Sequence, residues 1–596
     1  MQPSTGELED AQSVRQFLHK NGVAETLVCT VTALAYLGTL AFGFVYDDKP
    51  AIVDNIGIRS WGSLSHYFVR QLSTANGTPG GGTFYRPIAF LWLRLNYACF
   101  GLNPAGWHFA MLAGHVLMTY LVFAVVKKLT NHCTTAMIAG LLFGLHPVHV
   151  ENVAWLSSVG DLLMSVLLLG SFLAYLKFRD RGKTKIWLGI SLLLFALALL
   201  SKETAAVFPL LILAFSITSI SPLTFQKASL KSVLSEAWVS IPYFIILAGY
   251  LAIRLPMLHG VASPTTPLPW TTMLFTWPSA IWFDVKHLLL PLSSSEFYSL
   301  AYVTKPGLAS FLLPVLFVVV ALMTASFGIL RLPNPSLGFF ALIWAALPIL
   351  PTLYLRAVAP DNFVHDRFLY LPSVGIVLLL ALAIEQLSIP RTPRSSVEAM
   401  PTLGIVKWTV VALLAAVAFV ATSTYQLQWA NNILLYSDGI KSAPQNLIVK
   451  DNLANELSDL GDYESAIALY LSVLQQNPRF WSSNYNLGYT YYRLGRFAEA
   501  EGYLTRAIRI DNRDPDEFIF LARAQMQQGK LAQASQNADL ALEKAPLSPG
   551  FHFVRAKILE ARGLEKLAIA EYQAEVMYHP ENAVARSELR RARSLP

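Results

Sequence analysis

Eleven apolar stretches, each close to 20 residues long, constrain the fold of this chain more than any other feature of its sequence. They lie near residues 25–45, 106–126, 133–148, 159–178, 186–200, 204–221, 236–253, 309–330, 337–355, 368–388 and 404–424. An α-helix of about 20 residues crosses the hydrocarbon core of a bilayer with its backbone hydrogen bonds satisfied internally. The segments 133–148 and 186–200 are short, and we expect them to tilt or to recruit flanking residues. The pattern predicts an all-α, polytopic membrane domain over residues 1–425.

The composition supports this fold class. Of the 596 residues, 54% are hydrophobic and 14% are charged, which is too apolar for a soluble enzyme. We attribute the net charge of +7 to cationic loops between spans, and the sequence carries no nucleic-acid-binding motif. The three cysteines are scattered and form neither a disulfide framework nor a metal-spaced set.

Cationic loops indicate which side of the membrane each end of a span faces. They contain Arg15 and Lys20, Lys127 and Lys128, and the segments 177–185, 225–231 and 391–394. All of them fall on one side of the predicted spans, and cytoplasmic loops are enriched in Lys and Arg. We therefore expect a multi-pass protein of a bacterial inner membrane or the endoplasmic reticulum. Its amino terminus would be cytoplasmic and its carboxyl terminus periplasmic or lumenal.

Two further apolar segments carry charges that disfavour spanning. Residues 277–292 contain Asp284, Lys286 and His287, and residues 86–100 contain Arg94. Charged side chains are costly in hydrocarbon, so we predict amphipathic helices lying at the outer interface. If 277–292 instead spans the bilayer, every later segment changes sides.

With this topology, five polar clusters fall at the outer ends of the spans. They are Asp47–Asp48, "FYRP" at 84–87, "LHPVHVENVAW" at 145–155 with Asp161 after it, "SKET" at 201–204 and "NFVHDRFLYLPS" at 362–373. A transporter is expected to place its ionisable residues near the membrane midplane. Clusters at helix ends instead favour a site at the outer membrane surface, roofed by the long first loop, 46–105.

The last 150 or so residues have a different pattern, with a 34-residue period. Glycines recur at Gly461, Gly495, Gly529 and Gly563, and alanines at Ala466, Ala500, Ala534 and Ala568. This is the tetratricopeptide (TPR) period, in which a small residue lets two helices approach each other. We predict a TPR α-solenoid over residues 426–596, with a degenerate half repeat at 426–444, four repeats and a capping helix. Such a solenoid offers a groove for an acceptor polypeptide, although plain scaffolding is an equal alternative.

The order of the motifs resembles that of the transmembrane and tetratricopeptide-repeat-containing O-mannosyltransferases, which are GT-C glycosyltransferases. The matching stretches are "FVYDDKPAIVDN", "FYRPIAF", "LHPVHVENVA", "GDLL", "SKET" and "DRFLYLPSVG", followed by the repeats. The resemblance implies a GT-C-like fold with a catalytic first outer loop and an activity in protein glycosylation. It also implies a donor hexose, mannose or a similar sugar, on a polyprenyl phosphate.

Such a donor carries an ionised phosphate as its own leaving group. The reaction then needs a base for the acceptor hydroxyl and cations for the departing phosphate, and one base attacking in line inverts the anomeric centre. Asp47 and Asp48 are the catalytic candidates, with pKa values pushed apart by their mutual repulsion. The alternative is that they only cap the loop through backbone amides.

Three cations are candidates for binding the donor phosphate, namely Arg86, Lys202 and Arg367. An equal alternative for Lys202 is an ion pair with its neighbour Glu203, and for Arg367 an ion pair with Asp366.

The remaining polar residues of the clusters are expected to contact the acceptor or support the site. They are His146, His149, Glu151, Asp161 and Glu203. The spacing of "HPVHVE" differs from that of a helical zinc motif, and Pro147 disfavours a regular helix there. We therefore predict no metal and no certain cofactor besides the lipid-linked sugar, with a divalent metal as the disfavoured alternative.

The sequence thus predicts a membrane-embedded glycosyltransferase whose partners are a polyprenyl-phosphate sugar, an acceptor polypeptide and the membrane lipid. A non-enzymatic membrane scaffold that acts through its repeats is one alternative. A lipid or solute transporter is the other.

Overall fold

The computed structural model describes residues 22–63, 67–68, 85–180, 184–220, 237–258, 268–357, 362–388 and 399–594. Arg15, Lys20 and the cationic segments 225–231 and 391–394 lie outside these ranges. The chain forms two compact units, Met1–Ala443 and Pro444–Pro596. The regular elements of the described residues are α-, 3₁₀- and π-helices, without a strand, as the all-α prediction requires.

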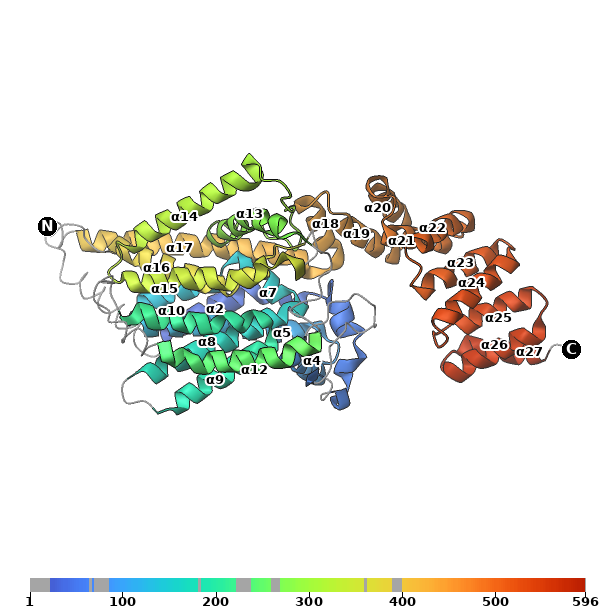
Figure 1. Cartoon of the computed structure of the whole chain (residues 1–596), viewed down its shortest axis with the longest axis horizontal. Helices are drawn as coiled ribbons and strands as arrows, with labels where there is room; N and C mark the ends of the chain where they lie inside the picture. The colour runs from blue at the N-terminus through green and yellow to red at the C-terminus, as the bar shows by residue number, and fades with distance from the viewer. Residues whose placement is uncertain are drawn as a thin grey trace. The chain divides into compact units, whose positions relative to one another are not determined.

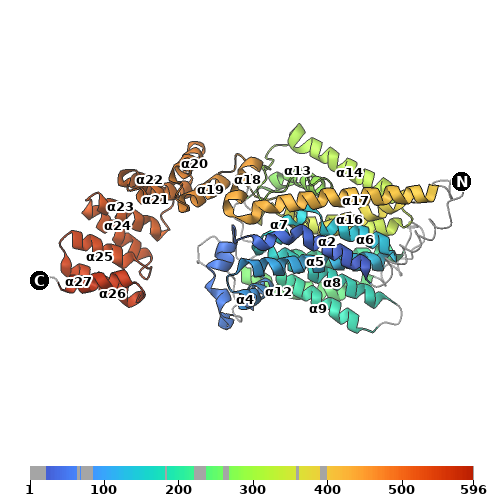
Figure 2. The ribbon, with the colours of Figure 1, turned by 180° about the vertical axis from the view of Figure 1, so that it is seen from behind.

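Each of the eleven predicted spans corresponds to a helix of the first unit. These helices are α2 (Val23–Tyr36), α5 (Pro104–Thr130), α6 (Cys133–Gly144), α8 (Val159–Arg179), α9 (Ile186–Ser201), α10 (Phe208–Ile220), α12 (Ile241–Leu258), α14 (Leu313–Ile329), α15 (Pro335–Ala346), α16 (Pro372–Glu385) and α17 (Ala399–Tyr425). Short 3₁₀ or π segments extend several of them, including η1 (Leu37–Ala41), η7 (Glu203–Val207), η9 (Leu308–Leu312) and η10 (Leu347–Leu353). Figures 1 and 2 show these helices side by side and roughly parallel.

Length and hydropathy separate these helices into two groups. Among the described residues, seven are long and apolar enough to cross a membrane. The eighth candidate is the bent pair of α6 with Pro147–Ala154, which turns by 52° at Leu145–His146. The segments Ile186–Ser201, Glu203–Ser219 and Pro372–Glu385 are apolar but shorter, as expected for spans that tilt or borrow flanking residues.

The centre of the unit is built from closely approaching helices. In α16, a Cβ on Gly375 would collide with the Ala341 carbonyl oxygen of α15, so glycine permits this contact. By contrast, only 6% of the apolar window of Leu308–Ile329 and 11% of that of Leu403–Ala430 are buried in protein. The apolar surfaces of α14 and α17 are therefore left for lipid.

The two charged apolar segments are helices, α4 (Pro87–Phe100) and α13 (Trp270–Leu289). Neither is among the helices apolar and long enough to span. The face of α13 that carries Asp284 and His287 is buried. Their predicted place at the outer interface remains a prediction.

Ion pairs identify which helix ends share one side of the unit. Lys127 at the end of α5 contacts Glu25 near the start of α2 at 2.8 Å. Its neighbour Lys128 contacts Asp180, just after α8, at 2.6 Å. Among the described cationic residues, Lys127, Lys128 and the start of the segment 177–185 thus share one end of the helices, which we call the cationic end. The opposite end, where α2, α6 and α9 finish, carries the predicted site and is called the polar end.

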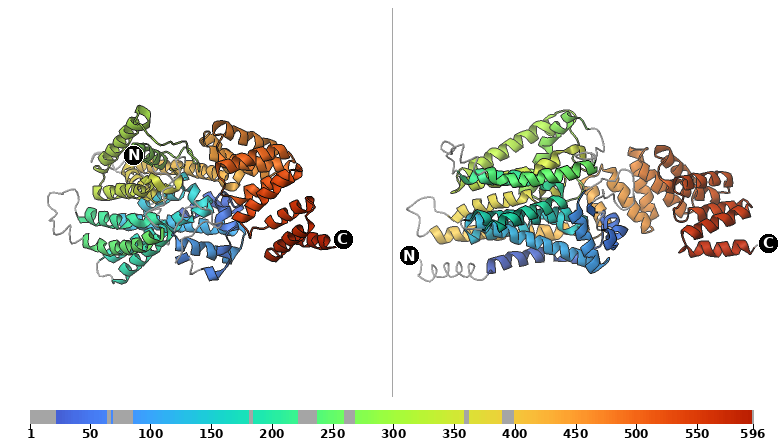
Figure 3. Two further views of the ribbon diagram at one scale, coloured as in Figure 1. Left: turned by 45° about the vertical axis from the view of Figure 1, so that its right-hand side comes forward. Right: turned by 60° about the horizontal axis from the view of Figure 1, so that its bottom comes forward.

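The second unit consists of antiparallel helix pairs. Its helices are α19 (Leu447–Asp459), α20 (Tyr463–Gln476), α21 (Trp481–Arg493), α22 (Phe497–Ile510), α23 (Pro515–Gln527), α24 (Leu531–Lys544), α25 (Phe551–Ala561), α26 (Glu565–Tyr578) and α27 (Ala583–Arg593). Successive helices pack against each other, as Figure 3 shows. The four periodic glycines, Gly461, Gly495, Gly529 and Gly563, have φ values of 88°, 74°, 73° and 72°. Each glycine thus makes the left-handed turn that joins the two helices of a repeat.

The alanines predicted at the helix crossings are buried. Ala466, Ala500 and Ala534 are 0% exposed and Ala568 is 1% exposed. This confirms the TPR fold of the carboxy-terminal part.

The boundary between the units lies later than the predicted one at residues 425/426. Residues 426–443 form η15 (Gln426–Ala430) and α18 (Asn432–Ser442) and cluster with the first unit. Trp429 stacks on Trp155 with ring centroids 5.8 Å apart, and the Tyr425 hydroxyl donates to the Leu292 carbonyl. The 34-residue register predicted that this segment belongs to the repeats. The ring stack and the hydrogen bond instead hold it against the first unit, since buried large rings contribute strongly to packing. The first unit therefore ends with a helix packed at its polar end.

Candidate functional site

The aspartate pair begins where the first span ends. The chain leaves η1 in an extended conformation and turns at Tyr46, whose φ of 54° is left-handed. The Tyr46 amide donates to Asn432 Oδ1 at 2.8 Å, which ties the turn to α18. This turn directs Asp47 and Asp48 into different surroundings.

Asp48 is buried, and both of its carboxylate oxygens accept hydrogen bonds. Its Oδ1 accepts hydrogen bonds from the Ser157 amide at 2.8 Å and the Ser157 hydroxyl at 2.6 Å. Its Oδ2 accepts from the Val45 amide at 3.1 Å. Burial raises the pKa of Asp48 to about 7, against the opposing effect of these hydrogen bonds. Asp48 thus links the loop that follows η1 to the segment before α8.

Asp47 differs from its neighbour because its side chain is exposed. The surrounding protein still removes enough water to raise the pKa of the Asp47 carboxyl, and the positive charge of Arg367 opposes that shift. An accessible carboxylate of raised pKa, close to a cation, has the properties of a general base.

Arg367 lies at the centre of a buried charge cluster. Its backbone amide donates to Glu151 Oε2 at 2.9 Å, and its Nη1 donates to Glu151 Oε1. The same Nη1 lies 3.2 Å from both carboxylate oxygens of Glu296. The guanidinium also stacks over Trp155, 5.0 Å from the ring centroid. The side chains of both glutamates are 1% exposed, whereas that of Arg367 is 16% exposed.

The charged side chains of this cluster alter one another's pKa values. Burial lowers the pKa of Arg367, but Glu151 and Glu296 outweigh it and raise that pKa above its ordinary value. Burial raises the pKa of Glu296, and Arg367 opposes the shift. These side-chain contacts occupy one of the three guanidinium nitrogens, so Arg367 keeps donors for a further anion.

Two more pairs lie at the polar end. Lys202 Nζ lies 2.6 and 2.5 Å from the two carboxylate oxygens of Asp161, with both side chains 8% exposed. Arg86 forms a bidentate pair with Glu203 at 2.6 and 3.0 Å, and these side chains are 21% and 25% exposed. Every predicted phosphate-binding cation is therefore paired with a carboxylate in this conformation.

The partners differ from the sequence neighbours that we weighed as alternatives. Lys202 pairs with Asp161 rather than with Glu203, because its backbone is extended (φ −157°, ψ 138°) and sends successive side chains in opposite directions. Arg367 pairs with Glu151 and Glu296 rather than with Asp366.

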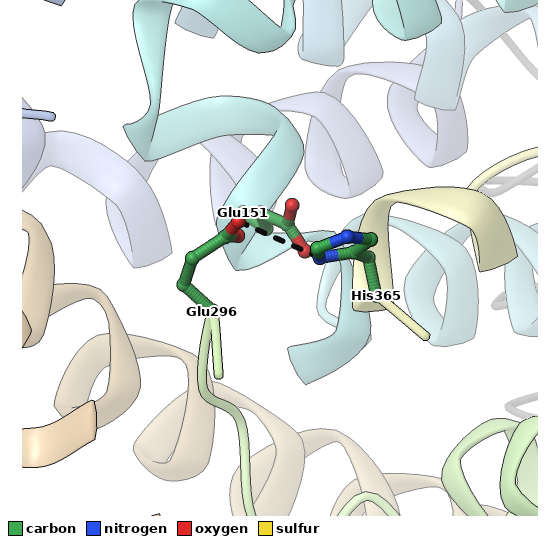
Figure 4. Close-up of side chains that lie close together, drawn as sticks. All are labelled: Glu151, Glu296 and His365. Carbon is green, nitrogen blue, oxygen red and sulfur yellow. Dashed lines mark ion pairs between the residues drawn. The ribbon is translucent and has the colours of Figure 1, made fainter. Parts of the chain in front are cut away.

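A group of three side chains can be tested as a metal site. Glu151, Glu296 and His365 come from three different parts of the chain and point toward one another (Figure 4), with one ligand atom from each lying within 4.8 Å of the others. Burial, with help from Arg367, lowers the pKa of His365 to about 3, so its imidazole is neutral and able to bind a metal. However, Arg367 already contacts both carboxylates. A divalent cation would face the positive charge of that guanidinium, so this set of side chains does not fit a metal.

The two histidines predicted to support the site point into the helix packing. His146 Nε2 lies 3.1 Å from the Leu288 carbonyl oxygen, and its Nδ1 accepts from the Val148 amide. His149 Nε2 lies 2.9 Å from Ser373 Oγ, and its ring packs edge-on against Tyr370. Both side chains are buried. The structure thus gives them structural contacts, and their predicted contact with an acceptor remains untested.

Sequence reasoning missed Glu296 and Ser157. Glu296 follows α13 in the hydroxyl-rich stretch "SSSEF", where it is the only acidic residue between 285 and 360. The signal that points to it is its isolation as the only carboxylate of a loop whose other charged residue is Lys305. Ser157 has no comparable signal, because its role depends on how the first loop folds over the bundle.

The fold and the polar end define a class: a polytopic helical membrane protein with carboxy-terminal tetratricopeptide repeats and a buried ionisable site at one end of its spans. Two family profiles match the chain. Residues 85–251 match the family described as dolichyl-phosphate-mannose-protein mannosyltransferase. Residues 452–515 and 521–583 match the family described as tetratricopeptide repeat.

Similar curated proteins are named protein O-mannosyl-transferases. Mouse TMTC3 is 26% identical over 511 residues, covering 80% of this chain and 53% of the relative. Human TMTC1 is 26% identical over 514 residues, covering 78% and 56%. Fruit-fly (Drosophila melanogaster) Tmtc2 is 36% identical over 204 residues, covering 32% and 21%. These matches confirm the resemblance to the transmembrane and tetratricopeptide-repeat-containing O-mannosyltransferases, although the chain spans only about half the length of the first two relatives.

Solved structures that resemble part of the chain include two TPR proteins. YrrB, a TPR protein with an unusual peptide-binding site, is 21% identical with a TM-score of 0.25, covering 26% of this chain and 81% of that one. TTC0263 from Thermus thermophilus is 20% identical with a TM-score of 0.25, covering 31% and 95%. The TPR assignment depends on the repeat profile and the periodic residues, and these two structures add no argument to it.

Proposed function

We propose that this protein transfers a hexose, mannose or a similar sugar, from a polyprenyl phosphate to a hydroxyl of an acceptor polypeptide at the extracytoplasmic face of the membrane. The observation that carries the proposal is an exposed carboxylate, Asp47, at the end of the unit where Arg367 is held by two buried glutamates; the charge of Arg367 is felt at Asp47. The similarity to proteins named O-mannosyl-transferases supports the choice of reaction.

The reaction balances with the groups of the polar end. Asp47 takes the proton of the acceptor hydroxyl as that oxygen attacks the anomeric carbon of the donor sugar. The bond from the anomeric carbon to the phosphate oxygen breaks, and its electron pair leaves with the phosphate. A phosphate ester is a good leaving group, so no general acid is required. Attack opposite the leaving group inverts the anomeric centre.

Three cations would stabilise the departing phosphate, namely Arg367, Lys202 and Arg86. Each is held by carboxylates that are buried or half-buried, so its position is fixed before the donor arrives. Preorganised charges of this kind stabilise a transition state without reorganising during the reaction.

Asp48 has a positioning role in this proposal. Its oxygens accept from Ser157 and Val45 and its side chain is 0% exposed, so an acceptor hydroxyl has no access to it. Its contacts fix the turn that presents Asp47. Of the two aspartates predicted as candidates, we therefore propose Asp47 as the base.

The repeats would recruit the acceptor polypeptide in the same compartment. The last helix of the first unit, α18, packs at the polar end, where Tyr46 and Tyr436 lie 6.4 Å apart between ring centroids. The chain continues from α18 into the repeats, and the proposal assigns both to the compartment in which the transfer takes place.

A transfer assay tests the proposal. The full chain in lipid nanodiscs is incubated with radiolabelled polyprenyl-phosphate mannose and unfolded polypeptides rich in Ser and Thr. We expect labelled polypeptide, sensitive to the glycosidase of the inverted anomer. Asp47→Asn should lower the rate by roughly 10²- to 10⁴-fold, the usual contribution of a general base.

The matched control is Asp54→Asn. Asp54 is an exposed aspartate of the same loop, and its replacement should leave the rate unchanged. Equal, measurable rates for Asp47→Asn and wild type would contradict the role of Asp47, whereas no transfer by the wild type would contradict the proposal and favour a non-enzymatic scaffold.

A further inference from the structure

A cavity outside the site just described lies between α13 and α14. Its volume is about 510 Å³. The wall on one side is α13, with Ser279, Trp282 and Lys286, and on the other side η9, the segment that leads into α14, with Ala309 and Ser310. The segment 300–305 of the connecting loop closes the end.

Cations and hydroxyls line the polar part of this cavity. Lys286 comes from α13 and Lys305 from the loop, and both side chains are exposed. Thr304 and Ser310 add hydroxyl groups. No acidic side chain lines the cavity, and no ion pair of either lysine is found in the part of the chain that the structure describes. The cavity therefore has an excess of two positive charges.

Aromatic and aliphatic side chains form the other part. Trp282 packs on Phe317 of α14 with ring centroids 5.0 Å apart. The α14 segment has the highest mean hydropathy of the seven candidate spans, 2.5, with 6% of its window buried. Leu312 and Leu316 are 56% and 52% exposed. A hydrocarbon surface thus continues directly from the cationic part of the cavity.

The frame of the cavity is fixed by hydrogen bonds and ring contacts. Ser279 Oγ donates to the Ser310 carbonyl at 2.5 Å, and the Val303 amide donates to Thr276 Oγ1 at 2.9 Å. Tyr302 stacks on Phe363 at 4.9 Å. These contacts hold the loop against α13, so the two lysines project from ordered backbone.

We propose that this cavity binds the phosphate headgroup of an anionic membrane lipid. The phosphate pairs with Lys286 and Lys305, and the hydrocarbon chains lie along α14 beside Trp282. Free phosphate would leave the adjoining apolar surface uncovered, and a zwitterionic headgroup would bring its own cation toward the two lysines. A lipid with net negative charge matches both parts at once.

The site is separate from the proposed reaction centre. Within the described residues, neither Lys286 nor Lys305 forms a hydrogen bond or ion pair with the Arg367 cluster, and lipid binding is measured without turnover. The loop that carries Lys305 also carries Glu296, which contacts Arg367. A bound lipid would therefore stabilise the loop that positions Glu296.

The test uses native mass spectrometry of the full chain released from nanodiscs. The nanodiscs contain phosphatidylcholine alone, or phosphatidylcholine with phosphatidylglycerol or with polyprenyl phosphate. We expect wild type to retain phosphatidylglycerol, polyprenyl phosphate or both. Retention should fall on the order of 5-fold in each of Lys286→Gln and Lys305→Gln and about 30-fold in the double variant, as expected for two lysine–phosphate attractions.

Three further variants separate the site from general effects. Lys441→Gln removes an exposed lysine of α18 and should retain lipid as wild type does. Lys286→Arg/Lys305→Arg keeps both charges and should retain it too. Ala309→Trp fills the cavity with the charges intact and should displace the lipid.

Each outcome decides the proposal. Loss of bound lipid in the glutamine and Ala309→Trp variants, with retention in Lys441→Gln and Lys286→Arg/Lys305→Arg, supports the site. The lipid that wild type retains shows whether the bound phosphate belongs to phosphatidylglycerol or to polyprenyl phosphate. Equal retention of phosphatidylcholine, or displacement of bound lipid by millimolar inorganic phosphate, overturns it. Unchanged retention in Lys286→Gln/Lys305→Gln also overturns it.

Discussion

The two ends of the membrane unit contain the same kinds of charged residue in opposite environments. At the cationic end, the Lys127–Glu25 side chains are 44% and 22% exposed and the Lys128–Asp180 side chains 36% and 30% exposed. At the polar end, the Lys202–Asp161 side chains are both 8% exposed, and Glu151 and Glu296 beside Arg367 are 1% exposed. These two pairs of the cationic end are partly solvated, whereas these pairs of the polar end are removed from water. The side chain of Lys407, which is 4% exposed and pairs with Glu385 at the cationic end, is an exception.

This difference shows where the protein keeps charged side chains in spite of the free energy needed to desolvate them. An exposed ion pair contributes roughly 0–1 kcal/mol, whereas burying a pair requires desolvation that its attraction barely offsets. Lys and Arg at the cationic end are explained by membrane topology. The buried pairs of the polar end have no such explanation, which is why we assign them to the reaction.

The largest loss of stability is expected on replacing Arg367, at the polar end. Arg367→Gln leaves Glu151 and Glu296 buried and facing each other without a cation. We expect a loss of about 3–5 kcal/mol in the free energy of unfolding of the membrane unit. Thermal unfolding in detergent, followed by helical circular dichroism, measures it. A loss below about 1 kcal/mol would mean that the polar end is as well solvated as the cationic end.

The second effect is a pH dependence at Asp48. The folded pKa of about 7 lies above the ordinary value of 3.8, so the folded state binds a proton that the unfolded state has released. The contribution of Asp48 to stability is complete below about pH 4 and is lost as pH rises to about 7. The ceiling on that loss is roughly 4 kcal/mol.

Thermal unfolding from pH 4 to pH 8 of wild type and Asp48→Asn isolates this contribution. The variant should lack the part of the pH slope that Asp48 supplies, and the Asp54→Asn control should keep it. Parallel pH profiles for wild type and Asp48→Asn would show that Asp48 is solvated.

A somewhat smaller effect, about 3 kcal/mol, is expected for Lys202→Met, because it leaves Asp161 buried and unpaired. The double variant Lys202→Met/Asp161→Leu removes both charges and should recover most of the stability. Transfer should remain lost, because the phosphate lacks its cation. Recovery of both stability and transfer in the double variant would show that the pair serves only the fold.

The smallest effect is predicted at the cationic end. Lys128→Gln should change the free energy of unfolding by less than about 1 kcal/mol, and by less still in 1 M salt, because the pair is exposed and screened. The measurement is the same thermal unfolding at two salt concentrations. A salt-independent loss of several kcal/mol would remove the contrast between the two ends.

Much of this architecture was predictable, because it depends on local patterns. The spans follow from hydropathy, and the repeats follow from glycines and alanines at fixed spacing. The pairing of charges was not predictable. Lys202 has Glu203 beside it in sequence, yet extended backbone turns it toward Asp161. Glu296 joins Glu151 only because the loop after α13 packs beside the turn that carries Arg367. Contacts of this kind depend on tertiary packing, which one sequence does not reveal.

The most direct test of the account concerns sidedness, because the site, the lipid-linked donor and the repeats must share one compartment. Cys29, Cys99 and Cys133 are replaced, and single cysteines are introduced as Lys49→Cys at the polar end, Lys185→Cys at the cationic end and Leu460→Cys in the repeats, all at exposed positions. Sealed vesicles are then labelled with a membrane-impermeant maleimide. The account predicts that Lys49→Cys and Leu460→Cys react only from the extracytoplasmic side and Lys185→Cys only from the cytoplasmic side. Labelling of Lys49→Cys and Leu460→Cys from opposite sides would contradict it.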